Sequence, residues 1–331
     1  MSSLLRAVAR FFREKVGLHR VGILLSLTIV VVAGFVLYRK LHGIDVNKVM
    51  LAMATVEHRN VALAALFVAL GYCTLTFYDL FALRTIGRKN VPYRVAALAG
   101  FTSYSIGHNV GASVFTGGAV RYHIYSTWGL NAVEVAKICF IAGLTFWLGN
   151  ATVIGLGIAY EPEAAAAINQ LPIWLNRTIA IAVLLVLVSY IAWVWSAPRM
   201  IGRLNWEVRL PGGPLTLLQI VIGIVDLSFC ALAMYMLVPN EPYYDFVAIA
   251  VIFVSATLLG FLSHSPGGLV VFDGAMLFAL WEYDAEELLA GLLIFRLLYY
   301  LSPFAISLVI LGVREFVLRL MSMHKVDRAP K

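Results

Sequence analysis

The feature that most constrains this sequence is a series of apolar runs, each long enough to cross a lipid bilayer as a helix. About 20 helical residues span the roughly 30 Å hydrocarbon core. Seven such runs occupy residues 21–38, 61–83, 133–159, 178–196, 215–238, 244–262 and 288–312. Hydrophobic residues make up 61% of the chain and charged residues 13%, which excludes an ordinary soluble domain. We therefore expect an all-α polytopic membrane protein with about seven or eight transmembrane helices.

The chain is expected to form a single membrane domain over residues 1–331, with no separate soluble domain. Its first apolar run ends in Tyr38, Arg39 and Lys40, where a cleaved signal peptide would carry small residues, so it is typical of a retained signal anchor. The expected parts of the domain are a basic N-terminus at 1–20, two repeats at 21–159 and 177–312, and a basic tail at 313–331.

Two stretches interrupt this apolar pattern with helix-breaking residues. Residues 107–118 read GHNVGASVFTGG, and residues 263–274 read SHSPGGLVVFDG. Inside a bilayer, irregular backbone persists only where it is buried in protein or lines a cavity, because its polar groups have no water to bind. These two breaks are therefore where we expect the functional site.

The distribution of Lys and Arg predicts the orientation of the chain. Five lie in 1–20, four in 84–94, three in 197–214 and five from 313 onwards, whereas 160–177 carries one and 239–245 none. The positive-inside rule places both termini and the loops at 84–94 and 197–214 in the cytoplasm. The loop 39–60, with four basic residues, is at odds with this assignment.

This topology requires each broken segment to enter the membrane and return. Residues 94 and 130 then lie on one side and residues 245 and 286 on the other, so the segments form re-entrant hairpins that open to opposite faces. The halves also share an order of landmarks: a membrane aspartate, a Gly-Gly pair and a basic residue in the closing helix, at Asp79, Gly117 and Lys137 and again at Asp226, Gly267 and Arg296. This order favours an inverted repeat with a pseudo-twofold axis in the membrane plane.

Ionisable residues inside the apolar sequence are the next indication of a site. A charge at the centre of a membrane helix costs about 2.5–3.5 kcal/mol on insertion scales, so such groups face a partner or a wet cavity. The residues concerned are Asp79, Arg121, Asp226, Asp273 and Arg296. The arginines suit bidentate capture of a phosphate. The aspartates are expected either to orient those arginines, to contact a cationic head group, or to form purely structural ion pairs.

Polar and aromatic neighbours complete the predicted substrate site. His108 with Asn109 and His264 lie at the two breaks, where each histidine is either a hydrogen-bonded packing group or a proton relay. Tyr122 and Tyr299 are close in sequence to Arg121 and Arg296, where a hydroxyl could join a head-group site or simply pack. No third ligand accompanies either histidine, and the three cysteines lack CxxC spacing, so we expect no metal, no cofactor and no catalytic residue.

Five motifs resemble one known family. They are Tyr78-Asp79-Leu80, residues 117–126 (GGAVRYHIYS), Trp147-Leu148-Gly149, residues 266–273 (PGGLVVFD) and residues 295–300 (FRLLYY). Together they resemble the membrane domain of lysylphosphatidylglycerol synthase/flippases (MprF) and its stand-alone relatives of the YbhN type. The resemblance implies a bacterial inner-membrane protein with re-entrant helices around a lipid-accessible cavity, concerned with moving or distributing phospholipids, aminoacylated lipids or hopanoid-type lipids.

The chain departs from this family in two respects. The aminoacyl-transferring soluble domain of the full-length synthases is missing, so we expect no enzyme activity of that kind. The family usually has Gly-Val-hydrophobic-Glu after Pro-Gly-Gly-Leu, whereas this chain has Val270-Val271-Phe272-Asp273. The shorter carboxylate makes the transfer of a family role to Asp273 less secure than the transfer to Arg296.

The leading hypothesis is a flippase-like lipid transporter, which binds an anionic or aminoacylated head group between the two repeats and gives alternating access to it. The alternatives are an ion- or proton-coupled transporter of a small solute, and a non-transporting membrane partner of a lipid-modifying enzyme. The expected partners are membrane lipids and no nucleic acid. Glycines in the spans are compatible with a homodimer as well as with internal packing.

Overall fold

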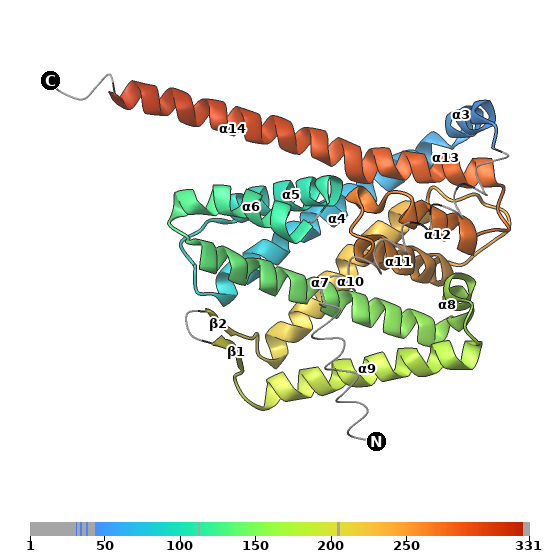
Figure 1. The fold of residues 1–331 in the computed structure, drawn as a ribbon, viewed down its shortest axis with the longest axis horizontal. Coiled ribbons are helices and arrows are strands. Elements are labelled where there is room, and N and C mark those ends of the chain that lie inside the picture. The colour runs from blue at the N-terminus through green and yellow to red at the C-terminus, as the bar shows by residue number, and fades with distance from the viewer. Residues whose placement is uncertain are drawn as a thin grey trace, which may run out of the picture.

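The computed structural model describes residues 44–111, 113–203 and 206–326, together with Val31, Gly34 and Tyr38 (Figure 1). In these ranges the chain is helical apart from one small β-hairpin. The elements are α3 Val46–Thr55, α4 His58–Thr85, α5 Tyr93–Val110, α6 Ser113–Tyr125, η1 Ser126–Trp128, α7 Ala132–Tyr160, α8 Pro162–Asn169, α9 Ile173–Ser196, β1 Met200–Arg203, β2 Trp206–Arg209, α10 Gly213–Tyr235, α11 Phe246–Leu262, η2 Pro266–Gly268, α12 Val271–Ala279, α13 Ala285–Arg296, η3 Leu297–Leu301 and α14 Ser302–Val326.

The all-α membrane fold expected from the apolar runs is confirmed. Five helices of the described chain are long and apolar enough to cross a membrane, namely α4, α7, α9, α10 and the continuous helix Ala285–Val317. The run 244–262 corresponds to α11, which has 17 residues and forms one arm of a hairpin. The run 21–38 lies outside the described residues, apart from three positions, so five spans rather than seven or eight are seen.

Both broken segments fold as helical hairpins, as predicted. α5 and α6 pack against each other, and Gly111 between them has φ +82°, a conformation that side chains other than glycine rarely adopt. α11 and α12 form the second hairpin around η2, where Gly267 and Gly268 both have φ +61°.

The tips of the two hairpins touch. A Cβ atom placed on Gly111 would lie 3.3 Å from the Cα atom of Pro266, and one placed on Gly267 would lie 3.7 Å from the carbonyl oxygen of His108. The absence of side chains therefore lets the two interruptions meet inside the protein, where their irregular backbone is shielded from lipid.

The hairpins enter from opposite ends of the molecule. Val91 before α5, Leu130 after α6 and Val208 of β2 belong to one buried apolar cluster. A different cluster holds Ala164 of α8 and Tyr283, the latter on the loop between α12 and α13. The residues flanking the first hairpin thus lie at one end and those flanking the second lie at the other, as the charge pattern predicts.

Side-chain contacts fix the first of these ends. Asn131 and Glu134 form a capping box at the start of α7, in which each side chain accepts a hydrogen bond from the other residue's backbone N–H group. Glu134 also pairs with Arg88, at 2.6 Å from Nη2 to Oε1, which holds the loop before α5 against α7. Which end faces the cytoplasm stays a prediction.

The last helix contains a π-helical turn. α13, η3 and α14 follow one another without a loop, and in Figure 1 they form the long helix that crosses the whole molecule. π-Turns leave backbone groups outside the regular ladder and often lie at functional sites. Here the turn begins directly after Arg296 and contains Tyr299 and Tyr300.

Candidate functional site

Arg121 and Asp79 form a buried ion pair between the first hairpin and α4. The guanidinium of Arg121 donates from Nε and Nη2 to the carboxylate, at 3.0 Å to Oδ2 and 2.7 Å to Oδ1 respectively. The Tyr125 hydroxyl donates to Oδ2 at 2.8 Å, and the Tyr104 ring lies under the guanidinium at 4.8 Å. Asp79 is 0% exposed and Arg121 5%, so the pair is buried. Whether Asp79 orients Arg121 for a ligand or is purely structural stays a prediction.

Arg296 and Asp273 form the corresponding pair in the second half. Arg296 Nε donates to Asp273 Oδ1 at 2.9 Å, and its Nη2 donates to Oδ2. Its remaining terminal nitrogen, Nη1, donates to the carbonyl oxygen of Gly267 at 3.2 Å. The shorter carboxylate of Asp273 therefore reaches its arginine, and the pair holds the hairpin tip against the π-turn. Binding of phosphate by Arg121 or Arg296 stays a prediction.

Asp226 differs from the other two aspartates because it pairs with none of the arginines that the structure describes. Its Oδ2 accepts a hydrogen bond from the Tyr78 hydroxyl at 3.0 Å. Its Oδ1 is buried without a hydrogen-bond partner among the described residues. A buried polar atom without a partner is costly, which makes Asp226 the carboxylate with capacity for a ligand.

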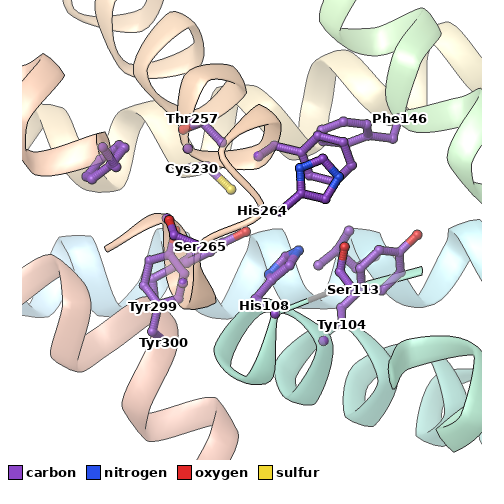
Figure 2. A pocket seen from close by; sticks show the side chains of 18 of the residues that line it. Tyr104, His108, Ser113, Phe146, Cys230, Thr257, His264, Ser265, Tyr299 and Tyr300 are labelled. Carbon is purple, nitrogen blue, oxygen red and sulfur yellow. The ribbon is translucent and has the colours of Figure 1, made fainter. Parts of the chain in front are cut away.

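Asp226 borders a cavity of about 210 Å³. Residues of both hairpin tips line this cavity, among them His108 and Ser265 (Figure 2). Most of the wall is aromatic or aliphatic, and it is contributed by both hairpins, α4, α7, α10 and the π-turn. Its aromatic members are Tyr104, Phe115, Phe146, Phe253, Phe261, Phe272, Tyr299 and Tyr300. An apolar cavity with few polar groups is typical of a small-molecule or lipid site.

The side chains at the mouth of this cavity are apolar and exposed at the surface of the protein. Val114 and Phe115 of α6 are 63% and 81% exposed, and Phe261 of α11 is 38% exposed. All three line the cavity. An exposed apolar rim of this kind is typical of a surface that contacts another apolar molecule.

The two histidines expected at the breaks both line the cavity. His108 comes from α5 and stacks on Tyr299 with a ring distance of 6.0 Å, while its Nδ1 is buried and has no partner in the described chain. His264 follows α11, has φ +56°, and its Nδ1 lies 2.9 Å from the carbonyl oxygen of Leu262. Figure 2 shows them on different elements bordering the same space.

The remaining predicted residues have separate places. Tyr299 lines the cavity, and its carbonyl oxygen accepts from the Tyr72 hydroxyl at 2.9 Å. Asn109 lies outside the cavity wall and donates to the carbonyl oxygens of Ser105 and Tyr300, at 2.8 and 3.0 Å. Tyr122 is 46% exposed and is not part of the wall.

The ten predicted residues therefore divide into three sets. Asp226, His108, His264 and Tyr299 meet at the cavity. Asp79, Arg121, Asp273 and Arg296 form two ion pairs. Asn109 and Tyr122 belong to neither the cavity wall nor an ion pair that the structure describes. In the part of the chain that the structure describes, no three His, Cys, Asp or Glu side chains are grouped so that they could hold a metal ion.

Comparison with known proteins gives related chains of similar extent. An uncharacterized protein of Synechocystis sp. is 28% identical over 295 residues, covering 88% of this chain and 89% of that protein. Inner membrane protein YbhN of Escherichia coli is 26% identical over 263 residues, covering 76% of this chain and 80% of YbhN. Phosphatidylglycerol lysyltransferase of Staphylococcus aureus is 22% identical over 276 residues, covering 83% of this chain but only 32% of that enzyme.

The resemblance to YbhN and to the lysyltransferase is confirmed. No protein-family model matches the chain. The similarity to YbhN extends over most of both chains, and together with the apolar helices it identifies a multi-pass membrane protein. The lysyltransferase match is different, because about two thirds of that enzyme lies outside it.

Sequence reasoning missed most of the cavity's aromatic wall. Tyr104 precedes His108 by four residues on α5, a spacing that puts both on one face of a helix and was a usable signal. Phe253 and Phe261 on α11 had no such signal, since that helix is apolar on every face. Tyr78 was noted only as part of a motif, although its hydroxyl donates a hydrogen bond to Asp226.

Proposed function

We propose that this YbhN-like chain is a flippase-like lipid transporter that binds the head group of an amine-bearing phospholipid in the cavity at the hairpin tips. The observation that carries the proposal is a carboxylate oxygen of Asp226, buried and unpartnered among the described residues, beside a cavity with an apolar, exposed rim. A lipid can enter such a rim sideways while its tails remain in the bilayer.

The chemistry of the cavity favours an amine as the group that is recognised. An ammonium group has three donors and no acceptor, so it suits a carboxylate that lacks a donor. Aromatic faces attract a cation within about 6 Å, and rings such as those of Tyr104, Tyr299 and Tyr300 surround the space. Both membrane arginines are already engaged by Asp79 and Asp273, so a phosphate would have to displace a carboxylate to reach either one.

The relatives support a lipid rather than a free solute. The name phosphatidylglycerol lysyltransferase states that the enzyme acts on a phospholipid. We do not extend lysine transfer to this chain, because the match covers only 32% of that enzyme. The similarity to inner membrane protein YbhN supports a bacterial inner membrane as the location of this chain. The distribution of Lys and Arg supports a cytoplasmic position for the loops 84–94 and 197–214.

Movement of the lipid would use the two hairpins as the parts of an inverted repeat. In this proposal α4, α5–α6 and α7 correspond to α10, α11–α12 and α13–α14. The hairpins enter from opposite ends and meet only at glycine-rich tips, so rocking one half against the other would open the cavity to alternate faces.

A proteoliposome assay tests the proposal. The purified chain is reconstituted with phosphatidylethanolamine, and lipid that reaches the outer leaflet is scored with an amine reagent that cannot cross the bilayer. We expect faster transfer than in protein-free vesicles, and at least a tenfold lower rate for Asp226→Asn, which corresponds to about 1.4 kcal/mol. Glu207→Gln, the equivalent change at an exposed position of β2, should keep the wild-type rate.

Two outcomes would contradict the proposal. One is transfer of phosphatidylethanolamine at the protein-free rate with the folded wild-type chain. The other is an equal rate for wild type and Asp226→Asn. Dependence of uptake of a water-soluble amine on an ion gradient, without lipid transfer, would point instead to a solute transporter.

A further inference from the structure

A second cavity, of about 330 Å³, lies beside the head-group cavity. It is enclosed by α7, α10 and α11, and its wall is almost entirely aliphatic, with Val153, Leu156, Ala231, Val247 and Ala250 as typical members. Tyr160 and Ser228 contribute its only side-chain hydroxyls. We call this space the aliphatic groove.

The groove adjoins the head-group cavity, and α7, α10 and α11 contribute to the walls of both. Leu227, next to Asp226 on α10, lines both spaces. On α11, Phe253 and Thr257 border the head-group cavity, whereas Phe246 and Ala250 border the groove one to two turns nearer the helix start.

The length of the combined space matches a lipid tail. From Thr257 to Phe246 the helix rises roughly 16 Å at about 1.5 Å per residue. Half of a bilayer's hydrocarbon core is about 15 Å thick. A tail that starts near Asp226, midway along α10, can therefore follow α11 to the end of the molecule that carries α8.

The groove is open to lipid and unsuited to water. Leu156 and Tyr160 at its edge are 56% and 70% exposed on membrane-spanning α7. An apolar cavity does not retain water, which needs two to four polar partners. At Gly157 the backbone of α7 lies close to α11, since a Cβ atom there would be 2.5 Å from Val251 Cγ2. Gly157 has no side chain that could occupy the groove.

We propose that the aliphatic groove binds one acyl chain of the lipid whose head group occupies the cavity at Asp226, so that the protein selects its lipid by tail length as well as by head group. The inference rests on the proposed function for the identity of the head group. The assignment of an acyl chain to the groove is supported by its aliphatic lining, its exposed edge and the residue Leu227 that it shares with the head-group cavity.

The test compares two probes that differ only in their tails. Binding of dioleoyl and dihexanoyl phosphatidylethanolamine to the purified full-length chain is measured for wild type, Ser228→Phe, Leu156→Trp, Asp226→Asn and Val186→Phe. Ser228→Phe places a ring inside the groove, and Leu156→Trp blocks it from an exposed position that tolerates a larger side chain. Val186 is 70% exposed on α9 and lies outside both cavities, so Val186→Phe is the matched control.

We expect both groove variants to weaken binding of the dioleoyl lipid at least tenfold and to leave the dihexanoyl lipid unchanged, while Val186→Phe changes neither. Unchanged dioleoyl affinity in the folded groove variants would overturn the inference even if Asp226→Asn weakened both probes. If Asp226→Asn weakened binding of neither probe, the head-group proposal would fail. The effect of Ser228→Phe on the dioleoyl lipid alone would then still show whether the groove binds an acyl chain.

Discussion

Single residues show how this chain keeps charges inside a membrane. Asp79 has three donors around it, two from Arg121 and one from Tyr125, so its carboxylate is fully satisfied at 0% exposure. Asp226 has one donor and a free oxygen among the described residues. The first is therefore suited to a structural role, and the second to binding.

Breaking the structural pair should destabilise the protein. We expect Asp79→Asn to lower the free energy of unfolding by about 3–5 kcal/mol, because it leaves the Arg121 guanidinium buried without its counter-ion. Unfolding in mixed detergent micelles measures this change. The double variant Asp79→Asn/Arg121→Gln should recover part of the loss, and a double variant as unstable as the sum of both single variants would contradict the account.

The sequence identified which residues carry charge into the membrane but not how they pair. Asp79 and Asp226 were equivalent as membrane aspartates, and each had several arginines as candidate partners. The outcome depends on how α4 and α10 are rotated about their axes. Rotation is set by packing of the whole bundle, and α10 has no strongly polar face that would reveal it.

At the scale of elements, close helix crossings determine where the cavity walls lie. α7 and α10 cross at Gly149 and Gly223, where a Cβ atom on Gly149 would lie 2.6 Å from the Cα atom of Gly223. The atoms in contact belong to the two backbones, so no side-chain movement can relieve the steric clash that an added methyl group would cause. Both helices line the two cavities, so this crossing fixes the distance between two of the walls.

A methyl group at this crossing should separate the two helices. We expect Gly149→Ala to cost about 1–3 kcal/mol of stability, as overpacking does in other cores. Gly143 lies on the same helix with no atom within 4 Å of an added Cβ, so Gly143→Ala should be neutral or stabilise by up to about 1 kcal/mol. Thermal unfolding of the two purified variants compares them, and equal melting temperatures would disprove the tight crossing.

The π-turn η3 is a second element whose stability can be tested. Two of its carbonyl oxygens accept from the other half of the chain, Tyr299 from the Tyr72 hydroxyl and Tyr300 from Asn109. Tyr72→Phe removes one donor while keeping the ring, at a cost of about 1–3 kcal/mol. Amide hydrogen exchange in 297–304 should then accelerate. Tyr122→Phe, which changes an exposed hydroxyl, should leave exchange there unchanged, and equal rates in the two variants would contradict this role.

Element positions followed well from the sequence where glycine and proline interrupt apolar runs, since the bilayer allows such breaks only inside the protein. The β-hairpin at 200–209 was not predicted, because each strand has only four residues and the alternation of apolar and polar residues in 206–209 is too short to distinguish a strand from a loop. α14 extends past the predicted end of the span at 312 to Val326, and Arg314 donates to Thr127 Oγ1 at 3.3 Å along this extension.

At the scale of the whole molecule, the loops 84–94 and 197–214 are rich in Lys and Arg, whereas 160–177 and 239–245 carry one such residue between them. Cysteine labelling decides which end is cytoplasmic. In a background without Cys73, Cys139 and Cys230, a reagent applied outside cells should modify Glu163→Cys and Tyr243→Cys, and should spare Lys89→Cys and Met200→Cys. All four positions are exposed, so the opposite labelling pattern would reverse the orientation.

The central claim is that a lipid head group lies against Asp226, and its most direct test is to locate a bound lipid. We propose electron cryo-microscopy of the chain in nanodiscs that contain phosphatidylethanolamine. The account predicts density for the amine within hydrogen-bonding distance of Asp226 Oδ1, with one tail along α11 in the aliphatic groove. An empty cavity at Asp226, with lipid phosphate bound instead at Arg121 or Arg296, would contradict it.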